Sequence, residues 1–108
     1  MTNRLLIIED DDSLNQMLQL HFEEQGFLVE GVNRCDQGLE KLKQSAYNLL
    51  LLDQQLPDGN GIDLLKRISD ESLDQTVIMM TGQHDLELAI EAIKLGAADF
   101  IHKPIKIS

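Results

Sequence analysis

The stretch "LLIIEDDDS", residues 5–13, runs four aliphatic side chains directly into four acidic ones. The aliphatic half is typical of a β-strand that is covered on both faces. Adjacent carboxylates repel one another, so the acidic half needs either full solvation or a cation. Asp11 and Asp12 fit the first alternative, because negative charge is favourable where a helix begins. The stretch therefore predicts a buried strand that ends in a charged loop.

Further short apolar runs recur along the chain, each with the length of a strand. The five predicted strands are "RLLII" (4–8), "FLVEGV" (27–32), "NLLLL" (48–52), "TVIMM" (76–80) and "DFI" (99–101). Apolar residues at helical spacing predict four helices between them, around residues 14–22, 39–46, 62–68 and 86–93. Strict alternation of strand and helix favours right-handed crossovers. The predicted fold class is α/β: a doubly wound, five-stranded parallel sheet with helices on both faces.

Residues with special backbone or capping preferences mark the ends of these elements. The glycines expected to end helices or bend turns are Gly26, Gly59, Gly61 and Gly96. Asp12 or Ser13 is the expected N-cap of the first helix and Asp85 that of the fourth. Asp58 in "LPDGNG" is expected to be a turn residue. The chain stops at "PIKIS" (104–108), so a fifth helix after the last strand is expected to be truncated.

Length and charge narrow the class of protein. The 108 residues are enough for one domain, spanning 1–108. Nineteen Asp and Glu against nine Lys and Arg give a net charge of −10, which opposes binding to nucleic-acid phosphates or anionic lipid. The lone Cys35 cannot form an internal disulfide, and no apolar run approaches the ~20 residues of a membrane span. We therefore expect a cytoplasmic domain with no direct nucleic-acid or membrane binding.

Three carboxylates follow two of the predicted strands. Glu9 and Asp10 come directly after the first strand, and Asp53 follows the third in "NLLLLDQQLPDGNG" (48–61). The carboxyl ends of parallel strands meet at one edge of the sheet, where ligands bind in this kind of fold. Converging carboxylates would raise one another's pKa values unless a hard cation neutralised them. Oxygen ligands with retained waters suit Mg²⁺, so a magnesium site is predicted here.

The remaining two strands bring polar groups of a complementary kind to the same edge. The fourth strand ends in "MMTG" (79–82), which places the Thr81 hydroxyl there, and the fifth leads into Lys103 in "FIHKP" (100–104). Taken singly, a strand-end Thr is more often a turn residue and a Lys near the C-terminus is more often solvated. Four strands that each deliver one such group favour a functional site.

With these motifs the sequence resembles the receiver domain of two-component response regulators, over residues 4–105. The matching stretches are "IIED", "LLLDQQLPDGNG", "MMTG" and "GAADFIHKP", in that order and at the family's spacing. The resemblance implies a flavodoxin-like fold with strand order 2-1-3-4-5. It also implies Mg²⁺-dependent transfer of a phosphoryl group from a histidine kinase to Asp53. Such a domain is regulatory: it catalyses its own phosphorylation and dephosphorylation and switches the output of a response regulator, here one of transcription.

The resemblance also assigns roles to individual residues. Asp10, Asp53 and the backbone carbonyl of Gln55 would bind Mg²⁺ directly, and Glu9 would act through a metal-bound water. Lys103, the Thr81 hydroxyl and the Gly82 amide would bind the phosphoryl oxygens. Thr81 and Phe100 would form the switch, and Gln55 and Gln83 would tune dephosphorylation.

Some positions leave alternatives open. Phe100 stands where many receivers have Tyr, so it is either a switch residue without a hydroxyl or simply part of the core. His21 lies on the apolar side of the first helix and is expected to be packed or half-buried. His84 and His102 flank the edge of the sheet without the spacing of metal ligands, and both are expected to be surface residues.

Rival functions are weaker. A haloacid-dehalogenase-type phosphatase uses a second Asp two residues after its nucleophile, and here that position is Gln55. A nucleotide-binding domain needs a Gly-rich loop after its first strand, and "EDDDSL" (9–14) has the opposite charge. A binding module controlled by a partner without phosphorylation is the serious alternative, and the complete set of site residues argues against it.

The C-terminal part carries two further expectations. The stretch "AIEAIKLGAADFIHKPI" (89–105) is similar to regulators that drive the ATPase activators of the nitrogen-type sigma factor, which implies the N-terminal part of a longer regulator with an effector domain. Without a fifth helix, the first helix alone would cover one face of the sheet. Exposed apolar surface costs roughly 25 cal/mol per Å², so we expect either a homodimer over that face or reduced stability.

Overall fold

A five-stranded parallel sheet forms the centre of the computed structural model, which describes residues 3–82 and 85–106. Its strands are β1 (Arg4–Ile8), β2 (Leu28–Val32), β3 (Leu49–Asp53), β6 (Val77–Thr81) and β7 (Asp99–His102). They lie in the order β2-β1-β3-β6-β7, and every neighbouring pair is parallel. Counted along this sheet the order is 2-1-3-4-5, so the predicted topology is confirmed.

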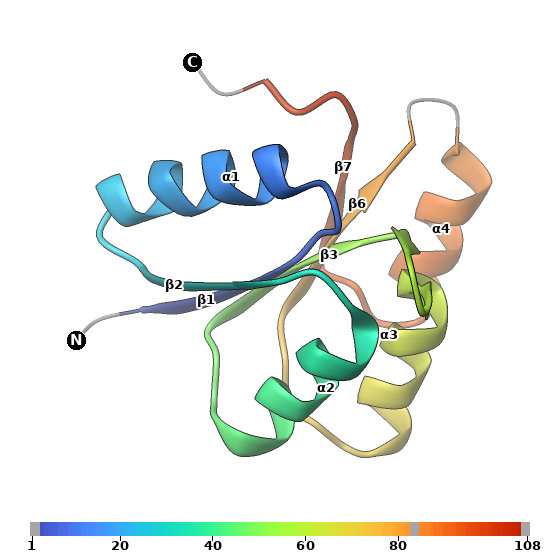
Figure 1. Ribbon diagram of the computed structural model, residues 1–108. Helices are drawn as coiled ribbons and strands as arrows, with labels where there is room; N and C mark the ends of the chain where they lie inside the picture. The colour runs from blue at the N-terminus through green and yellow to red at the C-terminus, as the bar shows by residue number, and fades with distance from the viewer. Residues whose placement is uncertain (1–2, 83–84, 107–108) are drawn as a thin grey trace.

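Helices cover both faces of the sheet, as predicted. The four are α1 (Asp12–Glu24), α2 (Cys35–Gln44), α3 (Gly61–Asp70) and α4 (Leu86–Lys94). Figure 1 shows α1 on one side of the sheet, and α2 and α3 together on the other with α4 beside α3. The segment after β7 runs back on the side of α1 (Figure 1).

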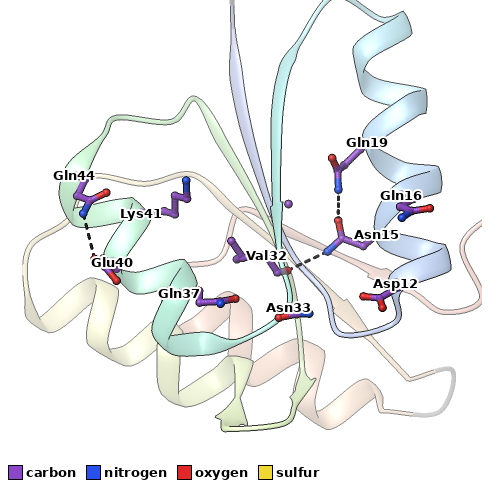
Figure 2. Close-up of a pocket in the computed structure, with 11 residues that line it drawn as sticks. Asp12, Asn15, Gln16, Gln19, Val32, Asn33, Gln37, Glu40, Lys41 and Gln44 are labelled. Carbon is purple, nitrogen blue, oxygen red and sulfur yellow. Dashed lines mark hydrogen bonds between the residues drawn. The ribbon is translucent and has the colours of Figure 1, made fainter.

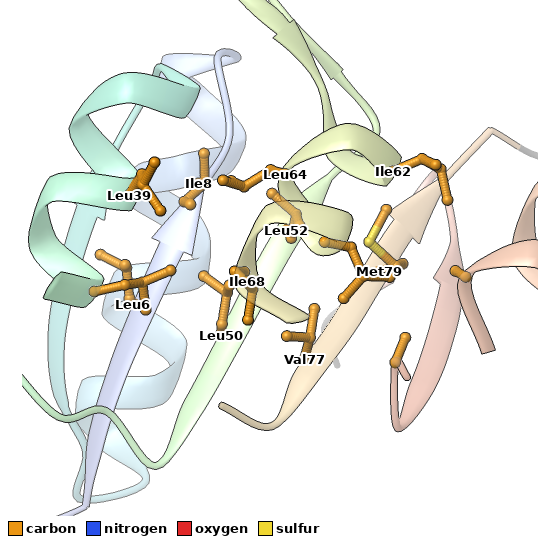
Figure 3. Packing of buried hydrophobic residues seen from close by; sticks show 14 of the residues in the cluster. Leu6, Ile8, Leu39, Leu50, Leu52, Ile62, Leu64, Ile68, Val77 and Met79 are labelled. Atoms are coloured by element: carbon orange, nitrogen blue, oxygen red, sulfur yellow. The ribbon is translucent and has the colours of Figure 1, made fainter. Parts of the chain in front are cut away.

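The central strands bury side chains in both directions because successive residues of a strand point to opposite faces. Leu50 and Leu52 of β3 belong to the larger apolar cluster, which α2 and α3 complete (Figure 3). Leu51 between them faces the second cluster, under α1. This is why the strands "RLLII" and "NLLLL" are apolar at every position and show no alternation.

The face under α1 is better covered than the sequence predicts. Leu51 of β3 and Met80 of β6 are at most 2% exposed, although α1 is the one helix on this side in the part of the chain that the structure describes. Ile105, after β7, packs against their cluster. The expectation of exposed apolar side chains is therefore wrong for Leu51 and Met80, whereas Ile101 of β7, on the same face, is 38% exposed.

A short hairpin after β3 was not predicted. Strands β4 (Gln55–Leu56) and β5 (Gly59–Asn60) pair antiparallel, and the turn between them contains Asp58. Two-residue strands are too short to show any hydrophobic period. The hairpin gives the loop after Asp53 a defined course into α3.

The helix caps differ in part from the prediction. Asp11, rather than Asp12 or Ser13, caps α1 by accepting a hydrogen bond from the Leu14 amide. Asp85 occupies the N-cap position of α4 but makes no side-chain cap bond. Asn60, not predicted, caps α3. The turn glycines are confirmed at Gly26 and Gly96, which have φ of 97° and 110°.

Asp58 is more than a turn residue. Its two carboxylate oxygens accept hydrogen bonds from the backbone amides of Cys35 and Asp36, at 2.8 and 3.0 Å. The carboxylate thus caps α2 from the β4–β5 turn. Sequence reasoning missed this cap because it joins positions far apart in the chain.

None of the helices within residues 3–82 and 85–106 combines the length and the apolar character that crossing a membrane requires.

Candidate functional site

Three carboxylates meet at the carboxyl end of the sheet, as predicted. Asp53 is the last residue of β3, and Glu9 and Asp10 directly follow β1, the neighbouring strand. One oxygen from each lies within 4.8 Å of the other two. Glu9 and Asp53 are 0% and 3% exposed, whereas Asp10 is exposed. Two of the three charges are therefore out of water, and the third is open to it.

Lys103 brings a positive charge to these carboxylates from the segment after β7. Its Nζ lies 3.0 Å from Asp53 Oδ1 and forms a second ion pair with Glu9 Oε1. Burial opposes the charged form of the lysine, but the Glu9 and Asp53 carboxylates outweigh it and raise the pKa of Lys103. The peptide bond from Lys103 to Pro104 is cis.

One lysine does not compensate all three acidic groups. Burial and the neighbouring Asp53 carboxylate raise the pKa of Glu9 above its ordinary value, even though Lys103 acts in the opposite direction. Burial and the nearby Glu9 carboxylate likewise raise the pKa of Asp10. The cluster is therefore short of positive charge.

The donor atoms fit a hard divalent cation. Among the described residues, Glu9 Oε1 is the buried side-chain oxygen to which the structure assigns no hydrogen bond, and the Lys103 ammonium is its charged partner. A divalent cation would add further positive charge beside this buried carboxylate. Mg²⁺ prefers oxygen ligands and usually keeps several of its waters. The buried Glu9 and Asp53 supply carboxylate oxygens, and the exposed side of the cluster at Asp10 leaves room for those waters.

A buried amide holds the backbone of the acidic loop in place. Asn15 of α1 donates hydrogen bonds to the carbonyls of Glu9 and Val32, at 2.9 and 3.0 Å, and accepts one from Gln19. Figure 2 shows the bonds that Asn15 makes with Val32 and Gln19. Asn15, Gln19 and Val32 also line a polar groove between α1 and α2, and none of the predicted site residues lines this groove. The sequence analysis did not single out Asn15. The sequence feature that could have indicated its burial is its position on α1 next to the apolar residues Leu14 and Leu18.

The loop after Asp53 is held by contacts that only glycine allows. A Cβ on Gly61 would lie 2.5 Å from the Asp53 carbonyl oxygen, so α3 begins directly against the backbone of the site. The Gln54 side-chain oxygen accepts a hydrogen bond from the Ile62 amide at 3.0 Å. Gln54 is another residue that the sequence did not single out.

The hydroxyl of Thr81 points to a partner that was not predicted. Thr81 is fully buried at the end of β6, and its Oγ1 lies 3.2 Å from His102 Nδ1. The same nitrogen lies 3.1 Å from the carbonyl oxygen of Gly82. The expectation that His102 is a surface residue is therefore wrong: the imidazole is half-buried because its strand position faces Thr81.

A family model described as the response regulator receiver domain matches residues 5–108. The chain belongs to this family. The receiver domain of response regulator 1452 from Francisella matches with a TM-score of 0.92 and 26% identity, over 97% of this chain and 87% of that one. The receiver domain of NtrX from Brucella abortus gives a TM-score of 0.88 at 28% identity, over 94% and 87%.

Curated relatives of this receiver domain are transcriptional regulators. DltR of Streptococcus agalactiae serotype III (strain NEM316) is 33% identical over 103 residues, which cover 95% of this chain and 46% of DltR. AtoC, a regulatory protein of Escherichia coli (strain K12), is 32% identical over 105 residues, or 97% of this chain and 23% of AtoC. The chain thus spans about half of the first relative and about a quarter of the second.

The remaining predicted positions differ in burial and contacts. Phe100 is half-buried and packs against the larger cluster, so it is in contact with the core. Gln55 starts β4 with its side chain exposed. Gln83 and His84 lie outside the described residues. His21 is half-buried with its ring edge-on to Phe22, as expected.

Proposed function

We propose that this receiver domain accepts a phosphoryl group on Asp53 from the phosphohistidine of a histidine kinase, in the cytoplasm. We further propose that the phosphorylated domain switches an effector domain of a longer transcriptional regulator, without itself binding nucleic acid. The observation that supports this best is the meeting of Lys103 Nζ with Asp53 Oδ1 at 3.0 Å, beside the Glu9 and Asp10 carboxylates.

The proposed reaction forms one bond and breaks one. An Asp53 carboxylate oxygen attacks phosphorus, the P–N bond to the kinase histidine breaks, and the released imidazole nitrogen takes up a proton. The product is an acyl phosphate on Asp53. Because nucleophile and phosphoryl group are both negative, alignment and charge neutralisation are the main sources of rate. The Lys103 ammonium already contacts the nucleophile and supplies part of that neutralisation.

The proposed reaction requires Mg²⁺ at the acidic cluster. Asp10, Asp53 and the backbone carbonyl of Gln55 would hold the ion directly, and Glu9 would do so through water. When bound, Mg²⁺ neutralises charge on the phosphoryl oxygens. The Thr81 hydroxyl and the Gly82 amide would donate hydrogen bonds to the oxygens that remain.

The same site would also reverse the modification. Attack of water on phosphorus breaks the bond to Asp53, releases inorganic phosphate and restores the carboxylate. Gln55 and Gln83 would line the approach of that water, and their amides can orient it but cannot deprotonate it well. The groups named lie on this one chain, so a small phosphodonor should be able to replace the kinase.

Intact-mass measurement tests the proposal. The protein is treated with acetyl phosphate and Mg²⁺, and the wild type should gain the mass of one phosphoryl group. Asp53→Asn and chelation of Mg²⁺ should each prevent the gain. Asp70→Asn is the matched control, because it removes the same kind of charge from an exposed position at the end of α3 and should be modified like the wild type.

Two outcomes would contradict the proposal. Modification of Asp53→Asn at the wild-type rate would place the nucleophile elsewhere. A wild-type protein that gains no phosphoryl group, from acetyl phosphate or from phosphorylated histidine kinases, would favour a binding module controlled by a partner alone.

A further inference from the structure

His102 contacts both residues to which the family resemblance gives the switch role, Thr81 and Phe100. It is the register partner of Thr81 across strands β6 and β7, and its Nδ1 lies 3.2 Å from the buried Thr81 Oγ1. Its ring also lies against that of Phe100, with centroids 5.2 Å apart and planes at 69°. Phe100 and His102 are two residues apart on one strand and so share a face of the sheet.

The position of the imidazole proton follows from a third contact. His102 Nδ1 lies 3.1 Å from the Gly82 carbonyl oxygen, which can only accept a hydrogen bond. That contact is favourable only when Nδ1 carries a proton. The N–H then points between the Gly82 carbonyl and the Thr81 hydroxyl oxygen, so His102 ties the end of β7 to the end of β6 at two atoms.

We infer that His102 is a positioning residue that holds the Thr81 hydroxyl in the unphosphorylated domain and competes for it with the phosphoryl group on Asp53. This inference rests on the proposed function. Within residues 3–82 and 85–106, His102 is the hydrogen-bond partner that the structure gives to the Thr81 hydroxyl. A bond from His102 Nδ1–H leaves the Thr81 hydroxyl proton free, so the competition is for the position of the side chain and not for the proton. Strand β6 lies between β3 and β7, so a Thr81 side chain held toward His102 would have to shift toward β3 to reach a phosphoryl group on Asp53.

Release of Thr81 would also change the surroundings of Phe100. The His102 ring packs against Phe100 while its nitrogen holds Thr81, so one imidazole restrains both side chains. Loss of the hydrogen bond would lower the cost of moving Thr81 toward Asp53. His102 therefore stabilises the unphosphorylated conformation, and its removal should favour the phosphorylated one.

Beryllofluoride, a phosphoryl mimic, provides the test at a fixed excess of Mg²⁺, with binding followed by fluorine NMR. His102→Leu, which keeps apolar contact with Phe100 but loses the hydrogen bond, should bind about two- to tenfold more tightly than the wild type, as expected for one net hydrogen bond. His102→Asn should stay close to the wild type, because its amide nitrogen can replace Nδ1–H. Equal or weaker binding by His102→Leu would overturn the inference.

A double-mutant cycle separates the hydrogen bond from general effects on folding. In a Thr81→Val background the hydroxyl is absent, so adding His102→Leu should leave the affinity for beryllofluoride unchanged. An effect of His102→Leu that persists there would show that it acts through another contact. Urea unfolding of the four proteins should also reveal a non-additive Thr81–His102 coupling without any ligand, and strict additivity would count against the inference.

Binding of beryllofluoride to the wild type separates failure of the proposed function from failure of the inference about His102. If it binds beryllofluoride and Asp53→Asn does not, the proposed function holds, and a lack of response to His102→Leu defeats the inference alone. If the wild type does not bind, the proposed function fails and the inference fails with it.

Discussion

The Lys103 ammonium lies 3.0 Å from the Asp53 carboxylate and also pairs with Glu9, so one lysine from the end of the sheet contacts the groups expected to hold magnesium. Lysine and metal would therefore share carboxylates. Lys103 contacts the two buried acidic residues, Glu9 and Asp53. Asp10 is exposed and has no ion pair among the described residues, so its carboxylate is open to a metal ion.

The first prediction follows from this sharing. Asp10→Ala should weaken Mg²⁺ binding by at least about tenfold, because it removes a carboxylate ligand and one negative charge. Lys103→Ala should not weaken it, since loss of the ammonium leaves the carboxylates more available to the metal. Titration calorimetry on both variants measures the difference. Equal losses of affinity would show that Lys103 is needed to shape the metal site.

The second prediction concerns Glu9 and pH. Its pKa is raised in the folded protein, which therefore holds this proton more tightly than the unfolded chain. The contribution of Glu9 to stability is fully present below its ordinary pKa of 4.5 and is lost as pH rises through the raised value. Glu9→Gln should thus stabilise the metal-free fold at neutral pH by roughly 1 kcal/mol, because the raised pKa means that burial of the carboxylate outweighs its ion pair with Lys103.

Urea unfolding across pH 4–8 checks the prediction for Glu9, with the exposed Glu23→Gln as control. Excess Mg²⁺ should raise the free energy of unfolding of the wild type more than that of Glu9→Gln. A Glu9→Gln variant that is less stable than the wild type at neutral pH without metal would mean that the ion pair with Lys103 outweighs the burial of the carboxylate.

The sequence predicted those parts of the site that depend on strand order. Glu9, Asp10 and Asp53 each stand at a strand end, so a parallel sheet brings them together whatever the details of packing. Thr81 and Lys103 were placed at the same edge by the same reasoning. The structure confirms that Lys103 reaches Asp53 and that the three carboxylates converge.

What the sequence did not predict depends on side-chain contacts between distant segments. Asp58 caps α2 across 22 and 23 residues, and Asn15 reaches one carbonyl just after β1 and another at the end of β2. Neither contact has a periodic signal, because each is set by how two elements pack. His102 was misjudged for the same reason: an imidazole next to a lysine at a strand end gives no indication that it faces a buried hydroxyl.

The third prediction concerns switching. If Thr81 binds a phosphoryl oxygen, the loop after β6 should move inward and Phe100 should fill the space that it leaves. Beryllofluoride with Mg²⁺ should then change amide exchange at least several-fold between residues 82 and 100, the segment that includes α4. In Thr81→Val the change should be much smaller, because the hydroxyl that couples the site to the segment is missing. Changes confined to the β4–β5 hairpin would contradict this route.

The last prediction concerns the segment that closes the face under α1. Ile105 packs against the cluster of Leu5, Ile7, Leu18, Leu51 and Met80, and it borders a cavity of about 260 Å³ together with Ile101. Ile105→Asp should uncover this face, lower the free energy of unfolding by about 1–3 kcal/mol and increase self-association, since exposed apolar surface tends to find a partner. The wild type should self-associate more weakly, because its central strands are already covered.

Sedimentation velocity over a concentration series, together with urea unfolding, checks the prediction for Ile105. Leu86→Asp is the matched control: it places the same charge on an exposed apolar residue of α4, away from this face, and should leave stability within about 0.5 kcal/mol of the wild type. If Ile105→Asp is as stable as the wild type and equally monomeric at every concentration, α1 alone is sufficient to close the sheet on this side. A loss of stability in Ile105→Asp but not in Leu86→Asp would instead attribute the closure to the residues that follow β7.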